Sequence, residues 1–166
     1  MNFIQTLAIA LLLLAFSVCG TVTLASAGDT AMSNIIITRK NSVEPASGPE
    51  SVFTGDVSVE FSVPRRGESR VSGGFVTFQP KARSNWHTHP YGQLLIIVTG
   101  KGRVQEWGQP VQDVFSGDLV WFPAGVKHWH GAAQDQAMSH YAIQEEQDGQ
   151  AANWMEKVTD AQYSGQ

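Results

Sequence analysis

The sequence predicts an all-β domain, either a sandwich or a barrel, because short apolar runs are separated by turn residues at regular spacing. The 166 residues include 16 glycines and 7 prolines, and 42% are hydrophobic while only 16% are charged. This composition is typical of a globular domain rich in turns and not of a disordered chain. No convincing helical pattern occurs before the C-terminal tail, and the length favours one compact domain.

Residues 1–27 have the pattern of a secretory signal peptide. No charged side chain precedes Asp29, residues 7–18 are almost wholly apolar, and Ala25-Ser26-Ala27 supplies small side chains for cleavage. Lys and Arg are absent before the apolar run, so a retained membrane anchor is the alternative, although the run is short for a membrane span. We therefore expect a periplasmic or secreted protein with no stable membrane association after cleavage.

The single cysteine, Cys19, is removed if cleavage follows Ala27. The mature chain then has no thiol for a disulfide, for nucleophilic catalysis or for metal ligation. Any metal must be held by His, carboxylate or amide groups. The net charge of −4, with no basic cluster beyond Arg65-Arg66, argues against a surface for nucleic acid.

The predicted elements begin with an N-terminal arm and loop over residues 28–56, which includes a short strand at the apolar island 35–37. The domain proper is expected over residues 57–166. Alternating apolar and polar residues from Val57 to Val63 predict its first strand. Further strands, most of them ended by Gly or Pro, are expected at 71–79, 93–99, 103–107, 119–122, 128–130 and 138–145. A capping box predicts one helical turn at Thr159–Gln162 in a short C-terminal tail.

Every residue from Leu94 to Val98 is apolar, so both faces of that strand need cover. One face would line the interior, and the other would be a liability if it were exposed. We therefore expect a symmetric assembly, a homodimer or a homotetramer.

Two His-x-His pairs carry the chemical signal. His87 and His89 point to one face of an extended segment, and His128 with His130 repeats this arrangement about forty residues later. The pairs converge only if their strands face each other, as in a barrel. A single buried histidine is more often held by an ordinary hydrogen bond, but two such pairs in one small β domain favour a divalent metal site.

The spacing of these residues resembles the two motifs of the cupin superfamily. The first, HxH-x3-E-x6-G, is matched at residues 87–100 with Gln93 in the Glu position, and the second, G-x5-P-x-G-x2-H, is matched at 117–128. The resemblance covers about 57–145 and implies a cupin double-stranded β-helix, a jelly-roll-like barrel. It also implies one divalent metal ion held inside by His87, His89, Gln93 and His128.

Gln93 departs from the motif, and the departure has a chemical consequence. A neutral amide still coordinates through its oxygen but brings no negative charge. The ion should therefore be a stronger Lewis acid and should support oxygen-activating iron chemistry less well.

The stretch from Trp86 to Tyr163 further resembles the bacterial cupin-type hydroxynitrile lyases. The shared patterns include His-Thr-His-Pro-x-Gly-Gln at 87–93, Pro-x-Gly-Val-Lys-His-Trp-His-Gly-Ala at 123–132 and Ala-Ile-Gln-Glu at 142–145. This resemblance implies a metal-dependent lyase that reversibly cleaves cyanohydrins to an aldehyde and HCN. It implies manganese as the metal, with iron, zinc or nickel as alternatives, His130 as the acid/base and Gln144 in the pocket.

Other functions remain open on the residues alone. A metal cupin of another reaction type, a dioxygenase or an isomerase, and a non-catalytic cupin that binds a small molecule are the alternatives. His140 and Gln144 have the same strand parity, and either could orient the substrate nitrile or a water. For His140, a structural hydrogen bond fits equally well.

Overall fold

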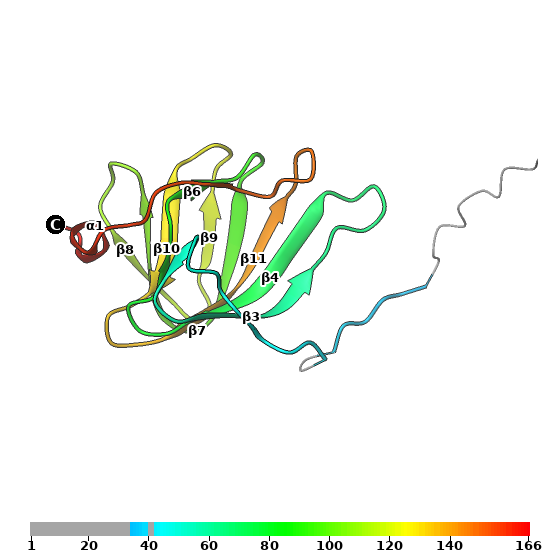
Figure 1. The fold of residues 1–166 in the computed structure, drawn as a ribbon, viewed down its shortest axis with the longest axis horizontal. Helices are drawn as coiled ribbons and strands as arrows, with labels where there is room; N and C mark the ends of the chain where they lie inside the picture. Colours follow the sequence, from blue (N-terminus) through cyan, green and yellow to red (C-terminus); the bar gives the residue numbers. More distant parts are fainter. Residues whose placement is uncertain (1–33, 40–41) are drawn as a thin grey trace, which may run out of the picture. The chain divides into compact units, whose positions relative to one another are not determined.

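The computed structural model describes residues 34–39 and 42–166, which contain twelve strands and one short helix (Figure 1). In chain order these elements are β1 (Ala46–Ser47), β2 (Phe53–Thr54), β3 (Val57–Val63), β4 (Val71–Phe78), β5 (Arg83–Ser84), β6 (His87–Thr88), β7 (Gln93–Glu106), β8 (Gln112–Phe115), β9 (Leu119–Phe122), β10 (His128–Ala132), β11 (Met138–Glu145), β12 (Asn153–Trp154) and α1 (Asp160–Ser164).

The strands form two antiparallel sheets that share β7. The first sheet has the order β1-β3-β4-β11-β7-β9. In the second, β10 lies between β7 and the short strands β5 and β6, β8 adds to the other side of β7, and β2 and β12 extend β5 and β6. The predicted all-β barrel is therefore confirmed.

One long strand occupies the place where the sequence predicts two. The expected break at Gly100-Lys101-Gly102 is wrong, because β7 runs without interruption from Gln93 to Glu106. Gly100 has φ of 79°, and a Cβ atom there would lie 1.8 Å from the carbonyl oxygen of Ala137. The glycine allows this close approach, and the strand passes from the first sheet to the second at this position.

The core lies between the two sheets and consists of buried side chains from both. Its largest members include Phe78, Leu95, Ile97, Phe122 and Met138. A second apolar cluster, Trp86, Trp129, Val158 and Tyr163, joins the second sheet to the C-terminal tail.

The C-terminal tail is fixed against the second sheet by buried polar contacts, and Figure 1 shows it running past β6 to α1. The buried Arg83 side chain donates to the carbonyl oxygen of Val158 at 2.9 and 3.1 Å and to Asp160 at 2.6 Å. Tyr163 donates to the carbonyl oxygen of Ala132 at 2.8 Å. The predicted helical turn is present as α1, with the capping box between Thr159 and Gln162.

The N-terminal expectations have mixed outcomes. The short strand predicted at 35–37 is wrong, because these exposed isoleucines pair with no strand among the described residues. Strand pairing begins instead at Ala46, within the segment expected to be an arm and loop. The predicted signal peptide, residues 1–27, lies outside the described residues. Within the described part of the chain, no helix is long and apolar enough to cross a membrane.

Candidate metal centre

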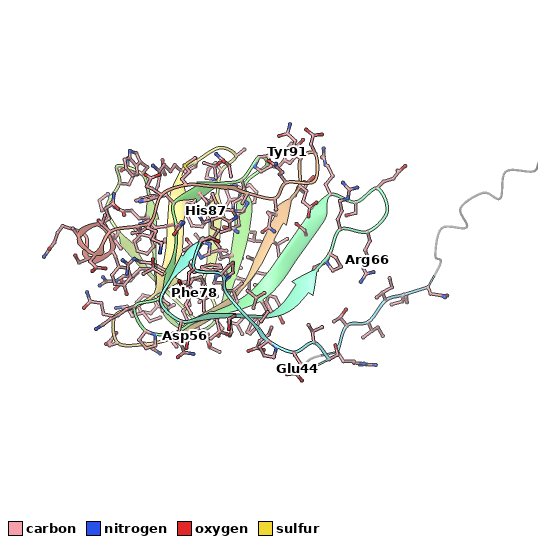
Figure 2. The ribbon with its side chains drawn as sticks, viewed as in Figure 1. Glu44, Asp56, Arg66, Phe78, His87 and Tyr91 are labelled. Carbon is pink, nitrogen blue, oxygen red and sulfur yellow. The ribbon has the colours of Figure 1, made fainter. Side chains whose placement is uncertain are left out.

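The two His-x-His pairs meet inside the barrel. His87 on β6 is opposite His128 on β10 in the strand register, and their ring centroids are 4.3 Å apart. The ring of His89, one residue beyond β6, lies 5.0 Å from that of His87 and 5.6 Å from that of His128. Figure 2 places His87 toward the end of the barrel at which Tyr91 lies, with Phe78 farther toward Asp56. Strand pairing thus brings together residues that lie about forty positions apart in the sequence.

Three of these rings are oriented in the same way by backbone carbonyl groups. Nδ1 of His87 donates to the carbonyl oxygen of Asn85 at 2.9 Å. In the same way, Nδ1 of His89 donates to Ala151 at 2.7 Å, and Nδ1 of His128 donates to Val126 at 2.9 Å. A neutral imidazole has a single N–H, so each ring presents the lone pair of Nε2 on its other side. A hydrogen bond from the second nitrogen to a carbonyl is the usual support of a metal-binding histidine.

The Nε2 lone pairs of the three histidines lack hydrogen-bond donors, and a bound cation would satisfy them. Those of His87 and His89 are buried and have no hydrogen-bond partner. Nε2 of His128 lies 3.3 Å from Oε1 of Gln93, so two acceptor atoms face each other. Buried lone pairs without donors are costly. A divalent ion would satisfy all four atoms, and the donor set fits such an ion.

The side chain of Gln93 is held by a second glutamine. Nε2 of Gln93 donates to Oε1 of Gln144 at 3.4 Å, and Nε2 of Gln144 donates to the Ser72 hydroxyl at 3.2 Å. These contacts assign the amide orientation in which Oε1 of Gln93 faces His128. Gln144, predicted to line the pocket and to orient the nitrile or a water, lies where it also positions Gln93.

His130 is a rival for His89 as a ligand. Ligand atoms of His87, His128 and His130 all lie within 4.8 Å of one another, a set that omits His89. However, Nδ1 of His130 is buried without a partner, whereas Nδ1 of His89 is bound to a carbonyl. Because the carbonyl-supported orientation is common to His87, His89 and His128, we favour those three as ligands and place His130 beside them. The ligand set remains a prediction.

All five histidines are kept neutral near pH 7. Burial, and after it the charge of His128, lowers the pKa of His87 well below 6.5, and burial lowers that of His89. Burial lowers the pKa of His128 and of His140 to about 4. Burial, and then the charge of His140, holds the pKa of His130 well below 6.5. Neutral imidazoles can serve both as metal ligands and as bases.

A cavity of about 540 Å³ lies beside these residues. Its apolar lining includes Phe53, Val76, Phe78 and Trp154, and its polar lining includes His89, Gln93, His130, His140 and Gln144. The volume suits a small organic molecule with an apolar body and a few polar atoms.

Sequence reasoning missed the part of the site formed by residues 150–154. The ring of Trp154 lies 4.5 Å from that of His87, and the carbonyl of Ala151 orients His89. No local spacing signals such contacts, since Ala151 follows His89 by 62 positions. Trp154 falls within the stretch that resembles the lyases, which was the one available indication.

The chain matches known proteins in both sequence and fold. The cupin domain profile matches residues 74–143. The (R)-mandelonitrile lyase of Granulicella tundricola is 49% identical over 127 residues, which cover 76% of this chain and 97% of that protein. This chain belongs to the cupin family. It is related to the hydroxynitrile lyases, as the motifs predicted, and the relative supports the expectation of an enzyme.

Solved structures agree with this assignment. A cupin-like protein from Thermotoga maritima is 36% identical, with a TM-score of 0.66 over 78% of this cupin and 95% of that chain. A polyketide cyclase from Streptomyces resistomycificus has a TM-score of 0.61 over 79% of this cupin and 92% of that chain, at 12% identity. The second likeness shows the fold alone.

Proposed function

We propose that this cupin is a metal-dependent lyase that cleaves an aromatic cyanohydrin to an aldehyde and HCN, and catalyses the reverse addition. The relative named (R)-mandelonitrile lyase supports the reaction class. The observation that carries the proposal is a neutral, buried His130 that lines the cavity beside the three carbonyl-supported histidines.

The proposed ion is held by His87, His89, His128 and Gln93. Manganese is our first choice, and iron, zinc or nickel would suit the same nitrogen and oxygen donors. When bound, the ion supplies Lewis acidity that makes a nearby hydroxyl group easier to deprotonate.

His130 acts as the base in the proposed reaction. The neutral ring accepts the hydroxyl proton of the cyanohydrin as the oxygen forms the carbonyl double bond. The bond between the carbinol and nitrile carbons breaks, and its electron pair leaves with cyanide. The imidazolium ion then returns the proton to cyanide, so that aldehyde and HCN are the only products. The apolar side chains Phe53, Phe78 and Trp154 would hold the aromatic ring and exclude water.

Release of HCN from mandelonitrile tests the proposal. Wild-type protein should release cyanide and benzaldehyde in equal amounts, and should lose this activity on chelation and regain it with Mn²⁺. If no metal-dependent rate above background appears in either direction, the lyase proposal fails. The dioxygenase, isomerase and binding alternatives would then remain for this cupin.

We also propose that the protein is exported and that it forms a symmetric homo-oligomer. The outer face of the first sheet supports the proposed homo-oligomer. Leu119 and Trp121 on β9 are 68% and 59% exposed, and they pair in register with Ile96 and Leu94 on β7. Tyr141 on β11 extends this apolar row beyond Ile96. A second copy presents the same row, so a two-fold axis would bury both surfaces together.

A further inference from the structure

We propose that His140 is a substrate-binding residue that donates a hydrogen bond to the nitrile nitrogen of the cyanohydrin. The inference rests on the proposed function and names a role for a histidine that the motifs leave unassigned. The ring of His140 is fully buried, and neither its Nδ1 nor its Nε2 atom has a hydrogen-bond partner.

The support for a structural role of His140 is a contact with the backbone of the adjacent Tyr141, which does not reach hydrogen-bond geometry. The neighbours of His140 in the strand register are Val76 on β4 and Ile97 on β7, whose side chains are apolar. The pairing of β11 with β7 shifts register between Ser139 and His140, and such irregularities often re-aim a side chain beside an active site. A buried imidazole without a partner costs stability, so a ligand is the group best placed to satisfy it.

Aromatic neighbours hold the ring of His140 at the wall of the cavity. It stacks on Phe78 with centroids 5.6 Å apart and an interplanar angle of 24°. The ring of His130 lies at 4.9 Å and 84° to it. Because both histidines line the same cavity, one bound molecule can contact both.

The Gln93, Gln144 and His89 side chains that line the cavity already donate to protein groups, whereas neither ring nitrogen of His140 has a partner. Nε2 of Gln93 donates to Gln144, Nε2 of Gln144 donates to Ser72, and Nδ1 of His89 donates to Ala151. The base role requires an unprotonated nitrogen on His130. A nitrile nitrogen can only accept a hydrogen bond, and a neutral imidazole supplies the one N–H that it needs.

Phenylacetonitrile is the probe that isolates this contact. It carries the nitrile but lacks the hydroxyl, so it cannot be cleaved, and ethylbenzene has the same ring without the nitrile. Dissociation constants would be measured by isothermal titration calorimetry of the metal-loaded protein. His140→Leu should weaken phenylacetonitrile binding about tenfold, the loss of one hydrogen bond, and should leave ethylbenzene binding unchanged. His140→Gln, which retains an N–H donor, should restore much of the binding. Tyr141→Phe, on the outer face of the same strand, is the matched control.

Stability provides a readout that does not depend on activity. If His140 serves the ligand and not the fold, His140→Leu should not lower the urea concentration at the unfolding midpoint of the ligand-free protein. A clear drop would indicate a structural role and overturn the inference, as would equal weakening of both probes or a wild-type protein that does not prefer the nitrile. Nitrile binding through His140 without HCN release would reject the lyase proposal alone. HCN release with unaltered phenylacetonitrile binding in His140→Leu would reject the His140 inference alone.

Discussion

Nε2 of Gln93 donates a hydrogen bond to Oε1 of Gln144 at 3.4 Å, and this contact turns the carbonyl oxygen of Gln93 toward His128. An amide has one acceptor oxygen and one donor nitrogen, and only the oxygen can bind a cation. Gln144 therefore selects the orientation of Gln93 that suits a metal ion.

Gln144→Met should weaken metal binding about tenfold, because loss of the partner that orients a ligand commonly costs 10–100-fold in affinity. Competition with a chromophoric chelator measures the affinity. Ile143→Val, on the opposite face of the same strand, is the control and should bind metal as the wild type does. Equal affinity of Gln144→Met and wild type would show that Gln93 needs no such support.

The metal-free protein should lose stability as the pH falls from about 6.5 toward 4. Burial lowers the pKa of His128 and of His140 to about 4, so the folded rings stay neutral while the unfolded rings gain protons below about 6.5. The unfolded state then binds more protons, and the free energy of unfolding falls by up to about 1.4 kcal/mol per pH unit for each such histidine. For these two histidines the loss levels off below about pH 4, where the rings are protonated in both the folded and the unfolded state.

Urea unfolding at pH 7.5, 6 and 5 measures this dependence. The expected curve falls between pH 6 and 5, above the range in which most carboxylates titrate. His140→Leu should make the free energy of unfolding less dependent on pH, because it removes the contribution of one histidine. A free energy of unfolding that is constant from pH 7.5 to 5 would contradict the burial account.

Gly100→Ala should destabilise the barrel far more than Gly108→Ala. Both glycines have φ near 80°, but a Cβ at Gly100 would meet the carbonyl oxygen of Ala137 at 1.8 Å, whereas a Cβ at Gly108 would meet nothing within 4 Å. The strain of the left-handed conformation costs roughly 1 kcal/mol at both positions, and the clash should add about 3 kcal/mol at Gly100. Thermal unfolding compares the two variants, and equal losses would show that the bend in β7 tolerates a side chain.

Much of this fold could be predicted because its signals are local. The alternation from Val57 to Val63 and the apolar run before Pro123 matched β3 and β9 in their bounds. The glycines at 100 and 102 led to the wrong prediction of a strand end within β7. A glycine that ends a strand and a glycine inside a continuous strand look alike in sequence. Only the neighbouring Ala137 backbone distinguishes them.

Some features of the candidate metal centre could be predicted from the sequence, and others could not. The motif spacing predicted that His87, His89, His128 and Gln93 would converge, and the structure brings them together. The carbonyl partners of the three histidine Nδ1 atoms could not be predicted, since backbone carbonyls carry no residue signature. For the same reason, the unpaired state of His140 became visible only when its neighbours Val76 and Ile97 were known.

The proposed assembly predicts that Trp121→Glu yields monomers. A carboxylate at this position would have to be buried without a partner in a two-fold interface, at a cost of several kcal/mol. Light scattering at micromolar concentration measures the mass. Trp107→Glu is the control, because Trp107 is 50% exposed and lies outside the first sheet. A wild-type protein that is monomeric in this measurement would reject the assembly.

In the proposed mechanism two neighbouring histidines have different roles: His89 holds the ion and His130 moves the proton. Metal content and HCN release from mandelonitrile, measured on the same preparations of wild type, His89→Ala and His130→Ala, test it most directly. We expect His130→Ala to keep one divalent ion per chain and to lose about 10²–10⁴-fold in rate, while His89→Ala loses the ion itself. Full turnover by metal-loaded His130→Ala, or wild-type metal affinity in His89→Ala, would contradict it.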